Sequence, residues 1–194
     1  MGDPRRKRKK YSTPTHPWQG ERIDEEKTLM TEYGLKNKKE IWKADSLLRN
    51  FKSQAKRLIS LPTKQAEIEA TQLLKKMNSL GLLEKNAKVE DVLGVNLRDV
   101  LERRFQTLVF RKKFSRSITQ ARQFITHRHM AIADRAIDVP SYLVKTEEES
   151  KLHVRPTSSL FSEDHPERII EEKKKPVKKK AEKKTKVKER KNEK

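Results

Sequence analysis

A long amphipathic pattern between residues 37 and 61 is the feature that most limits how this chain can fold. Apolar side chains recur there at helical spacing and fall on one side of the predicted helix: Ile41, Ala44, Leu47, Leu48, Phe51, Ala55, Leu58 and Ile59. Asn37 is a suitable N-cap, Glu40 completes a capping-box pattern, and Pro62 ends the segment. A helix of this length with one apolar side needs partners that cover that side.

The segments that follow supply such partners. Thr63 can cap a second helix that runs to about residue 78, and Gly81 suits the left-handed conformation that often ends a helix. A further helix is predicted over residues 96–110, after a short helical turn. Helices joined by short connections predict a small bundle over residues 37–102.

Residues 115–142 combine a helix with short strands. Ser117 as N-cap predicts a helix to about His127, with its apolar side chains on one side: Ile118, Ala121, Phe124 and Ile125. The other side carries only hydrogen-bonding, non-acidic residues: Thr119, Gln120, Arg122, Gln123, Thr126 and His127. Two short strands are predicted at 130–132 and 136–139. A side without acids is what a surface contacting phosphates and 2′-hydroxyls requires.

Charge is high and concentrated at the two ends. The formal net charge is +20, of which residues 1–20 contribute +5 and residues 171–194 contribute +8. Only 32% of residues are hydrophobic and 39% are charged, so much of the chain cannot enter a core. We expect an extended basic arm at the start and a lysine-rich tail that is disordered when alone. A polyanion is the expected partner, because each neutralised phosphate releases counterions.

Three regions supply candidate RNA-binding side chains. The region around the helix of residues 117–127 offers Arg103, Arg104, Arg111, Lys112, Lys113, Arg116, Ser117, Gln120, Arg122, Gln123, His127, Arg128 and His129. The edge of the long helix offers Arg49, Lys52 and Lys56, and the arm offers Arg5, Arg6, Lys7, Arg8, Lys9, Lys10 and Tyr11. A basic helix edge is commonly only a solvated surface. Arg122 could pair with a carboxylate, but RNA is favoured because no acid lies on its side of the helix.

Other classes of function find little support. The chain has no cysteine, which excludes disulfides and Cys-ligated zinc, and no apolar run of the ~18 residues that a membrane span needs. The histidines and carboxylates form no acid–base pair, and His127 and His129 lack a third metal ligand. We expect no enzyme, cofactor, metal, membrane or small-molecule substrate. The alternative that stays open is an RNA chaperone or non-specific nucleic-acid compactor that acts through basic tails.

Residues 103–144 resemble an RNA-binding domain named after the S-four protein of the small ribosomal subunit. The resemblance rests on Val109-Phe110-Arg111, Phe114, Arg116-Ser117, Gln120-Ala121-Arg122-Gln123, His127 and Pro140-Ser141-Tyr142. Residues 1–18 and 33–59 are similar to the N-terminal region of the archaeal and eukaryotic branch of the S-four ribosomal protein family. Two features depart from bacterial members. Ala133-Asp134 replaces the Asn-Gly hairpin turn, and the absent cysteines rule out an N-terminal zinc cluster, so we expect RNA to order the arm.

Pattern and resemblance together predict a predominantly helical α+β protein. It would comprise an extended basic arm (1–36), a helical domain (37–102), an S-four-type RNA-binding domain of two helices and a β-hairpin (103–160), and a lysine-rich tail (161–194). The resemblance implies a cytoplasmic, structural constituent of the small subunit that binds 16S-type ribosomal RNA directly and early in assembly. It further implies a place near a multi-helix junction, beside ribosomal protein S-five and close to the messenger RNA entry side, and an influence on translational accuracy.

Overall fold

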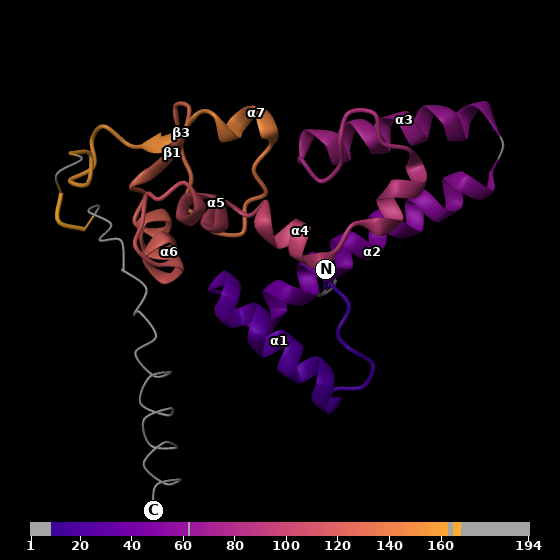
Figure 1. The fold of residues 1–194 in the computed structure, drawn as a ribbon, viewed down its shortest axis with the longest axis horizontal. Coiled ribbons are helices and arrows are strands. Elements are labelled where there is room, and N and C mark those ends of the chain that lie inside the picture. The colour runs from indigo at the N-terminus through magenta and orange to yellow at the C-terminus, as the bar shows by residue number, and fades with distance from the viewer. Residues whose placement is uncertain (1–8, 62, 163–164, 168–194) are drawn as a thin grey trace, which may run out of the picture.

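The computed structural model describes residues 9–61, 63–162 and 165–167, and the lysine-rich tail lies almost wholly outside these residues. The elements, drawn in Figure 1, are α1 (Gly20–Tyr33), α2 (Lys38–Ser60), α3 (Lys64–Ser79), the 3-10 helix η1 (Val89–Gly94), α4 (Leu97–Glu102), α5 (Phe105–Arg111), α6 (Ile118–Thr126), β1 (Met130–Ile132), β2 (Arg135–Ala136), α7 (Thr146–Glu149) and β3 (Leu152–Val154). The predicted α+β class, mostly helical with a small sheet, is confirmed. Within the described residues, no helix is both long and apolar enough to cross a bilayer.

The long helix α2 and its neighbour α3 form the bundle predicted from their spacing. Phe51 and Ala55 of α2 are buried against Leu73 and Met77 of α3, and η1 closes the same core. Thr63 caps α3 as expected, because its hydroxyl oxygen accepts a hydrogen bond from the backbone N–H of Ala66 at 3.2 Å. Burial of apolar surface along the α2–α3 contact is the main force that holds the two helices together.

The beginning of the chain differs from the expectation. Residues 1–36 were predicted as an extended arm, yet Gly20–Tyr33 form α1. Tyr33 and the next apolar residue, Leu35, are buried against Ile41 of α2 and Leu101 of α4. The prediction was wrong because the apolar residues Leu29, Met30 and Tyr33 find a tertiary core against α2 and α4, which stabilises the helix.

The module built by α5, α6 and the sheet has its own core. Phe105, Val109, Phe124 and Ile125 pack with Met130 and further residues of the sheet side. In Figure 1 this module lies at one end of the molecule and the α2–α3 tip lies at the other. The module is therefore a separate packed unit on the same chain, joined to the bundle through α4.

The predicted helix over 96–110 is broken into α4 and α5. Arg104 forms a β-bridge with Leu143, the backbone N–H of Phe105 donates to Tyr142 at 2.8 Å, and that of Val144 donates to Arg103 at 3.0 Å. These bonds join the junction of α4 and α5 to a segment about forty residues later in the sequence, so the backbone is not helical at Arg104. Helical periodicity continues through such a break, which is why the sequence alone predicts one helix.

The sheet has three antiparallel strands in the order β2-β1-β3. Strand β1 is where the sequence predicted it, whereas the second strand is Arg135–Ala136 instead of 136–139. The N–H of Ile137 still donates to the Met130 carbonyl at 3.4 Å, and the chain then turns at Val139, whose carbonyl accepts from the N–H of Tyr142 at 3.2 Å. In the hairpin loop only Ala133, with φ 49°, has a positive φ, so the turn is not the type I′ turn that needs two.

A glycine at the end of α1 lies where α1 contacts α5 and the start of α6. Gly34 has φ 57°, and its carbonyl accepts a hydrogen bond from the amide of Gln106 in α5 at 3.1 Å. A Cβ at this position would lie 2.7 Å from Ile118 Cγ2 and 2.9 Å from Gln106 Nε2. Only glycine meets both the left-handed backbone and this close approach.

We therefore expect Gly34→Ala to lower the free energy of unfolding by about 2 kcal/mol or more, from backbone strain of about 1–2 kcal/mol plus the clash. Chemical denaturation followed by circular dichroism measures the change. Gly94→Ala is the matched control, because a Cβ there meets nothing within 4 Å. Equal stabilities for the two variants would contradict this account.

Candidate nucleic-acid interface

One side of α6 forms an exposed stripe of polar residues without acids. Ser117 caps the helix by accepting from the N–H of Gln120 at 3.2 Å, as predicted. Thr119 and Gln123 are exposed and lie one turn apart on α6, and the exposed Arg116 and His127 stand just before and just after the helix. We call these four residues the α6 stripe. Thr119 was not among the candidates, although its spacing places it there.

Two of the predicted RNA-binding arginines, one buried and one partly exposed, form ion pairs with the same carboxylate. Arg104 is 4% exposed and forms a short ion pair with Glu40 of α2. Arg122 of α6 reaches the other oxygen of Glu40 at 3.3 Å and also contacts Gln106 Oε1 at 3.5 Å. The expectation that Arg122 meets no acid was wrong, because Glu40 lies 82 residues away in sequence. Burial lowers the pKa of Arg104, and the negative charge of Glu40 opposes that shift.

Glu40 was also predicted to act as part of a helix cap. Asn37 occupies the N-cap of α2, but its side chain makes no capping hydrogen bond. The Glu40 carboxylate faces the two arginines, so the capping-box prediction is wrong. Charge-assisted hydrogen bonds from the buried Arg104 and the partly exposed Arg122 are stronger than one from a helix-end N–H.

The basic cluster before α6 is largely engaged with α7. Arg103 pairs with Glu149 at 2.9 Å and donates to the carbonyl of Val144 at 3.3 Å, and the Lys112 ammonium donates to the carbonyl of Glu149. Arg111 pairs with Glu102 at 2.6 Å, although about half of its side chain stays exposed. These side chains line a hollow of about 540 Å³, and Asp99 adds a further carboxylate to its lining. Mixed charges make this hollow a poor phosphate site.

Lys113 differs from Arg111 and Arg128 in having no ion pair with a described carboxylate. It is exposed, its backbone has φ 60°, and it stands in the connection that leads to the α6 stripe. Arg128 is also exposed but pairs with Asp138 at 3.1 Å. Lys113 therefore supplies positive charge beside the stripe with less competition from carboxylates.

The basic edge of α2 is real but partly neutralised. Arg49 pairs with Asp45 at 2.7 Å and lies 3.5 Å from the hydroxyl of Ser12. Lys56 is exposed and Lys52 is half-buried. This edge retains a positive charge that either solvent or a phosphate backbone can meet.

The described part of the arm is ordered by the protein itself. Tyr11, a predicted RNA-contacting residue, lies against Trp42 with ring centroids 6.2 Å apart. The N–H of Ser12 donates to Ser46 Oγ at 3.0 Å, so the expectation that RNA alone orders the arm is wrong for this part. Lys9 and Lys10 are exposed. The candidates Arg5, Arg6, Lys7 and Arg8 lie outside the described residues.

A shallow pocket at the end of α6 contains His127, His129, His165 and Glu167. His129 Nδ1 lies 2.7 Å from Ser158 Oγ, and its ring lies 6.2 Å from that of His127. Burial lowers the pKa of His129, His127 lowers it further, and Glu167 partly opposes the shift. Among the described residues, no group of three histidine or carboxylate side chains is arranged to hold a metal ion.

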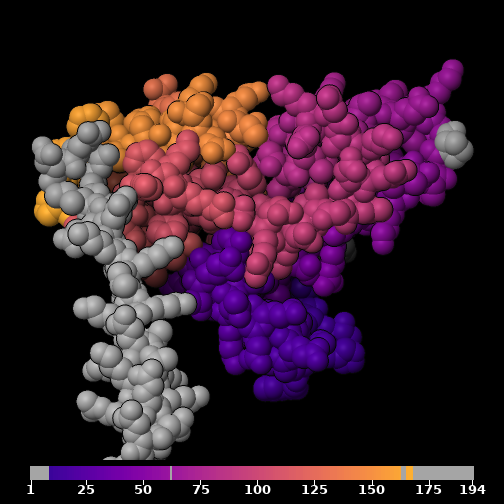
Figure 2. Space-filling view, viewed as in Figure 1, coloured from indigo at the N-terminus to yellow at the C-terminus, as the bar shows by residue number. Residues whose placement is uncertain are grey.

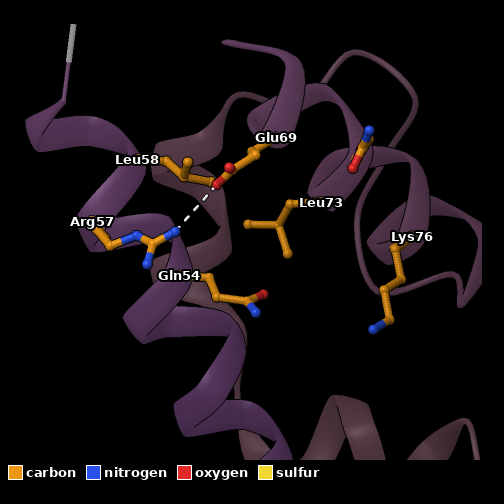
Figure 3. Close-up of a pocket in the computed structure, with 7 residues that line it drawn as sticks. Gln54, Arg57, Leu58, Glu69, Leu73 and Lys76 are labelled. Atoms are coloured by element: carbon orange, nitrogen blue, oxygen red, sulfur yellow. Dashed lines mark hydrogen bonds and ion pairs between the residues drawn. The ribbon is translucent and has the colours of Figure 1, made fainter. Parts of the chain in front are cut away.

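A second hollow lies between α2 and α3 and is drawn in Figure 3. It has a volume of about 230 Å³, and Arg57 pairs with Glu69 across it at 3.2 Å. Leu58 and Leu73 form its apolar part. The side chains that line it include no histidine, serine or cysteine, so they provide no nucleophile with an adjacent base.

We expect Glu40→Gln to lower the free energy of unfolding by about 3 kcal/mol, because it leaves Arg104 buried without its counter-charge. Denaturant unfolding at pH 7 measures the loss. Glu69→Gln is the matched control. Its partner Arg57 is about two-thirds exposed, so that change should cost less than about 1 kcal/mol. A Glu40 variant as stable as the control would refute the central role of this carboxylate.

The depressed pKa of His129 predicts a pH dependence of stability. The ring is held neutral in the fold, so its contribution is complete above the unfolded pKa of about 6.5 and is lost as the pH falls below that value. We expect the free energy of unfolding to decrease between pH 7.5 and pH 5.5, and His129→Asn to flatten that decrease. Denaturant curves across this pH range provide the measurement, and an unchanged slope in the variant would rule the histidine out.

Two family models together match most of the chain. The model described as the ribosomal protein S4/S9 N-terminal domain matches residues 4–102, and the S4 domain matches residues 103–150. Small ribosomal subunit protein uS4 of Methanococcus aeolicus is 53% identical over 169 residues, which are 87% of this chain and 96% of that protein. The uS4 protein of Ignicoccus hospitalis is 48% identical over 161 residues, or 83% of this chain and 97% of that protein.

These matches run through both the α2–α3 bundle and the α5–α6 module, and the relatives are archaeal. The resemblance stated from the sequence motifs is confirmed, as is the cytoplasmic ribosomal location that it implied. The chain belongs to the uS4 family of small ribosomal subunit proteins.

Proposed function

We propose that this protein is a structural constituent of the small ribosomal subunit that binds its 16S-type ribosomal RNA directly. The observation that carries the proposal is the α6 stripe, an exposed surface of a +20 chain whose own four residues include no acid, although Glu167 lines the pocket at its end. Amide, hydroxyl and imidazole groups on such a surface can meet backbone oxygens and 2′-hydroxyls. We propose no catalytic activity.

Recognition would depend on shape and charge together. Arg116 and Lys113 would meet phosphates, while Thr119, Gln123 and His127 would contact sugar and backbone groups in a groove. Lys9 and Lys10 would add charge from the arm, and Lys56 from α2. Because the Glu40 ion pairs hold α2 and α6 in one arrangement, these separated cations would meet RNA as a single surface.

The finer parts of the proposal follow from family membership. We propose binding early in assembly, on the body of the subunit near a multi-helix RNA junction, with ribosomal protein S-five as a neighbour and the messenger RNA entry side nearby. An influence on translational accuracy would follow from that place. The competing function is an RNA chaperone or compactor, in which the basic ends bind any nucleic acid and the α6 stripe has no role.

A salt-series titration separates these functions. We expect the protein to prefer a junction fragment of small-subunit ribosomal RNA over duplex RNA and duplex DNA of equal length. The log–log salt slope should be about −4 or steeper, because each neutralised phosphate contributes about −0.7 to −0.9. Equal affinities for the three nucleic acids would favour the compactor.

The variant Gln123→Glu tests the stripe itself. Gln123 is exposed and lines the shallow pocket beside His127 and Glu167. A carboxylate there should weaken junction binding by about tenfold, or ~1.4 kcal/mol, through repulsion of phosphates. Gln72→Glu makes the same change at an exposed residue of α3 that lines the α2–α3 hollow, and it should have little effect on RNA binding. If the two variants bind alike, RNA does not contact α6.

A further inference from the structure

The most exposed large hydrophobic side chain among the described residues is Trp18, which is 91% exposed. It stands two residues before α1, in the part of the molecule that Figure 2 shows as an indigo lobe projecting from the rest. Isolated exposed leucines or valines are ordinary, but an indole left almost wholly in water has a large apolar area without a partner. Tryptophan is also the residue type most enriched among the anchors of protein interfaces.

The backbone that carries Trp18 is held firmly. Nη2 of Arg22 donates to the carbonyls of His16 at 3.0 Å and Pro17 at 2.9 Å, and Nη1 pairs with Glu26. Glu26 in turn accepts from the indole N–H of Trp42 at 3.0 Å. The arm therefore presents Trp18 from a fixed position, which limits the entropy that would be lost on binding.

The buried carboxylate under this arrangement is ionised. Burial raises the pKa of Glu26, but hydrogen bonds from Trp42, Lys38 and Arg22 outweigh it and leave the pKa below its ordinary value. Glu26 thus balances the charge of Arg22 inside the lobe. The net charge on the outside of the lobe is therefore set by residues other than Arg22 and Glu26.

Charges of both signs lie on the outside of the lobe: Lys27 is exposed and pairs with Asp24, whereas two glutamates have no such partner. Glu21 and Glu25 are exposed, lie four residues apart on one side of α1, and have no ion partner among the described residues. A carboxylate in the first turn stabilises a helix, which accounts for Glu21 but not for the exposed indole beside it. A cavity of about 240 Å³ opens between the arm, α1 and α2, and its lining holds the carboxylates Glu25, Glu26 and Asp45 together with Arg22 and Arg49.

We propose that Trp18, Glu21 and Glu25 form a docking surface for a lysine- or arginine-rich segment of a neighbouring protein of the small subunit. An arginine or lysine can stack on the indole while its positive charge, or that of the next residue, pairs with the carboxylates. RNA does not fit this surface, because unpaired carboxylates repel phosphates. The inference rests on the proposed function, which places the chain in an assembly of other proteins.

Residue-resolved hydroxyl-radical footprinting tests the proposal with the full chain. Oxidation of Trp18 is measured in the free protein, in the complex with small-subunit ribosomal RNA alone, and in subunits reconstituted with the remaining small-subunit proteins. We expect equal oxidation in the first two states and at least a fivefold decrease in the third. Protection by RNA alone, or no protection in the subunit, would overturn the proposal.

The double variant Glu21→Lys/Glu25→Lys sharpens the test. It should restore Trp18 oxidation in the subunit while leaving RNA affinity equal to or higher than that of the wild type. Glu67→Lys on the exposed side of α3 is the matched control and should leave Trp18 protected. If the double variant stays protected, the carboxylates do not hold the partner.

Two further experiments test whether the chain's own tail covers Trp18 and whether Trp18 contacts protein or RNA. If Trp18 is protected in the free protein and becomes exposed on removal of residues 171–194, the chain's own tail occupies the surface and the proposal is wrong. Replacing Trp18 and Gln123 in turn by the photo-crosslinker p-benzoylphenylalanine should give crosslinks to protein at the first site and to RNA at the second. A failure at Gln123 with loss of RNA binding overturns the proposed function, whereas an RNA crosslink at Trp18 overturns only this inference.

Discussion

The ion pairs between Glu40 and the arginines Arg104 and Arg122 decide how the two halves of this protein stand relative to each other. Glu40 comes from the first turns of α2, Arg104 from the junction of α4 and α5, and Arg122 from α6. One carboxylate thus compensates two cations, and Arg104 Nη1 has no hydrogen-bond partner among the described residues. Desolvated charges of this kind tolerate few alternative geometries, because any displacement leaves a buried guanidinium uncompensated.

Around this centre, Gln106 adds a neutral link. Its amide N–H groups donate to the carbonyls of Gly34 and Ile118, and its oxygen lies 3.5 Å from Arg122. The end of α1, the start of α6 and the ion pairs are therefore one connected polar network inside an otherwise apolar contact. Apart from Arg104 Nη1, the polar groups of this network have partners, so a different arrangement would leave further desolvated polar atoms without one.

The distinction between structural and available cations follows from this packing. Arg103, Arg104 and Arg122 hold the protein together, whereas Lys113 and Lys56 face solvent. Net charge therefore overstates the number of side chains that can meet phosphates. It also hides Glu21 and Glu25 of α1, which have no ion partner among the described residues of a chain of formal charge +20.

The sequence by itself determined the local elements and the family. Apolar spacing predicted α2, Thr63 and Ser117 predicted two helix starts, and the motifs of residues 103–144 identified the RNA-binding module, because each of these signals depends on residues near one another in the chain. The tertiary structure alone decided the partners of Glu40, the break at Arg104 and the contact of Tyr11 with Trp42. Those contacts join segments separated by thirty residues or more. Whether Glu40 caps its own helix or pairs with a distant arginine depends on distances that exist only in the folded chain.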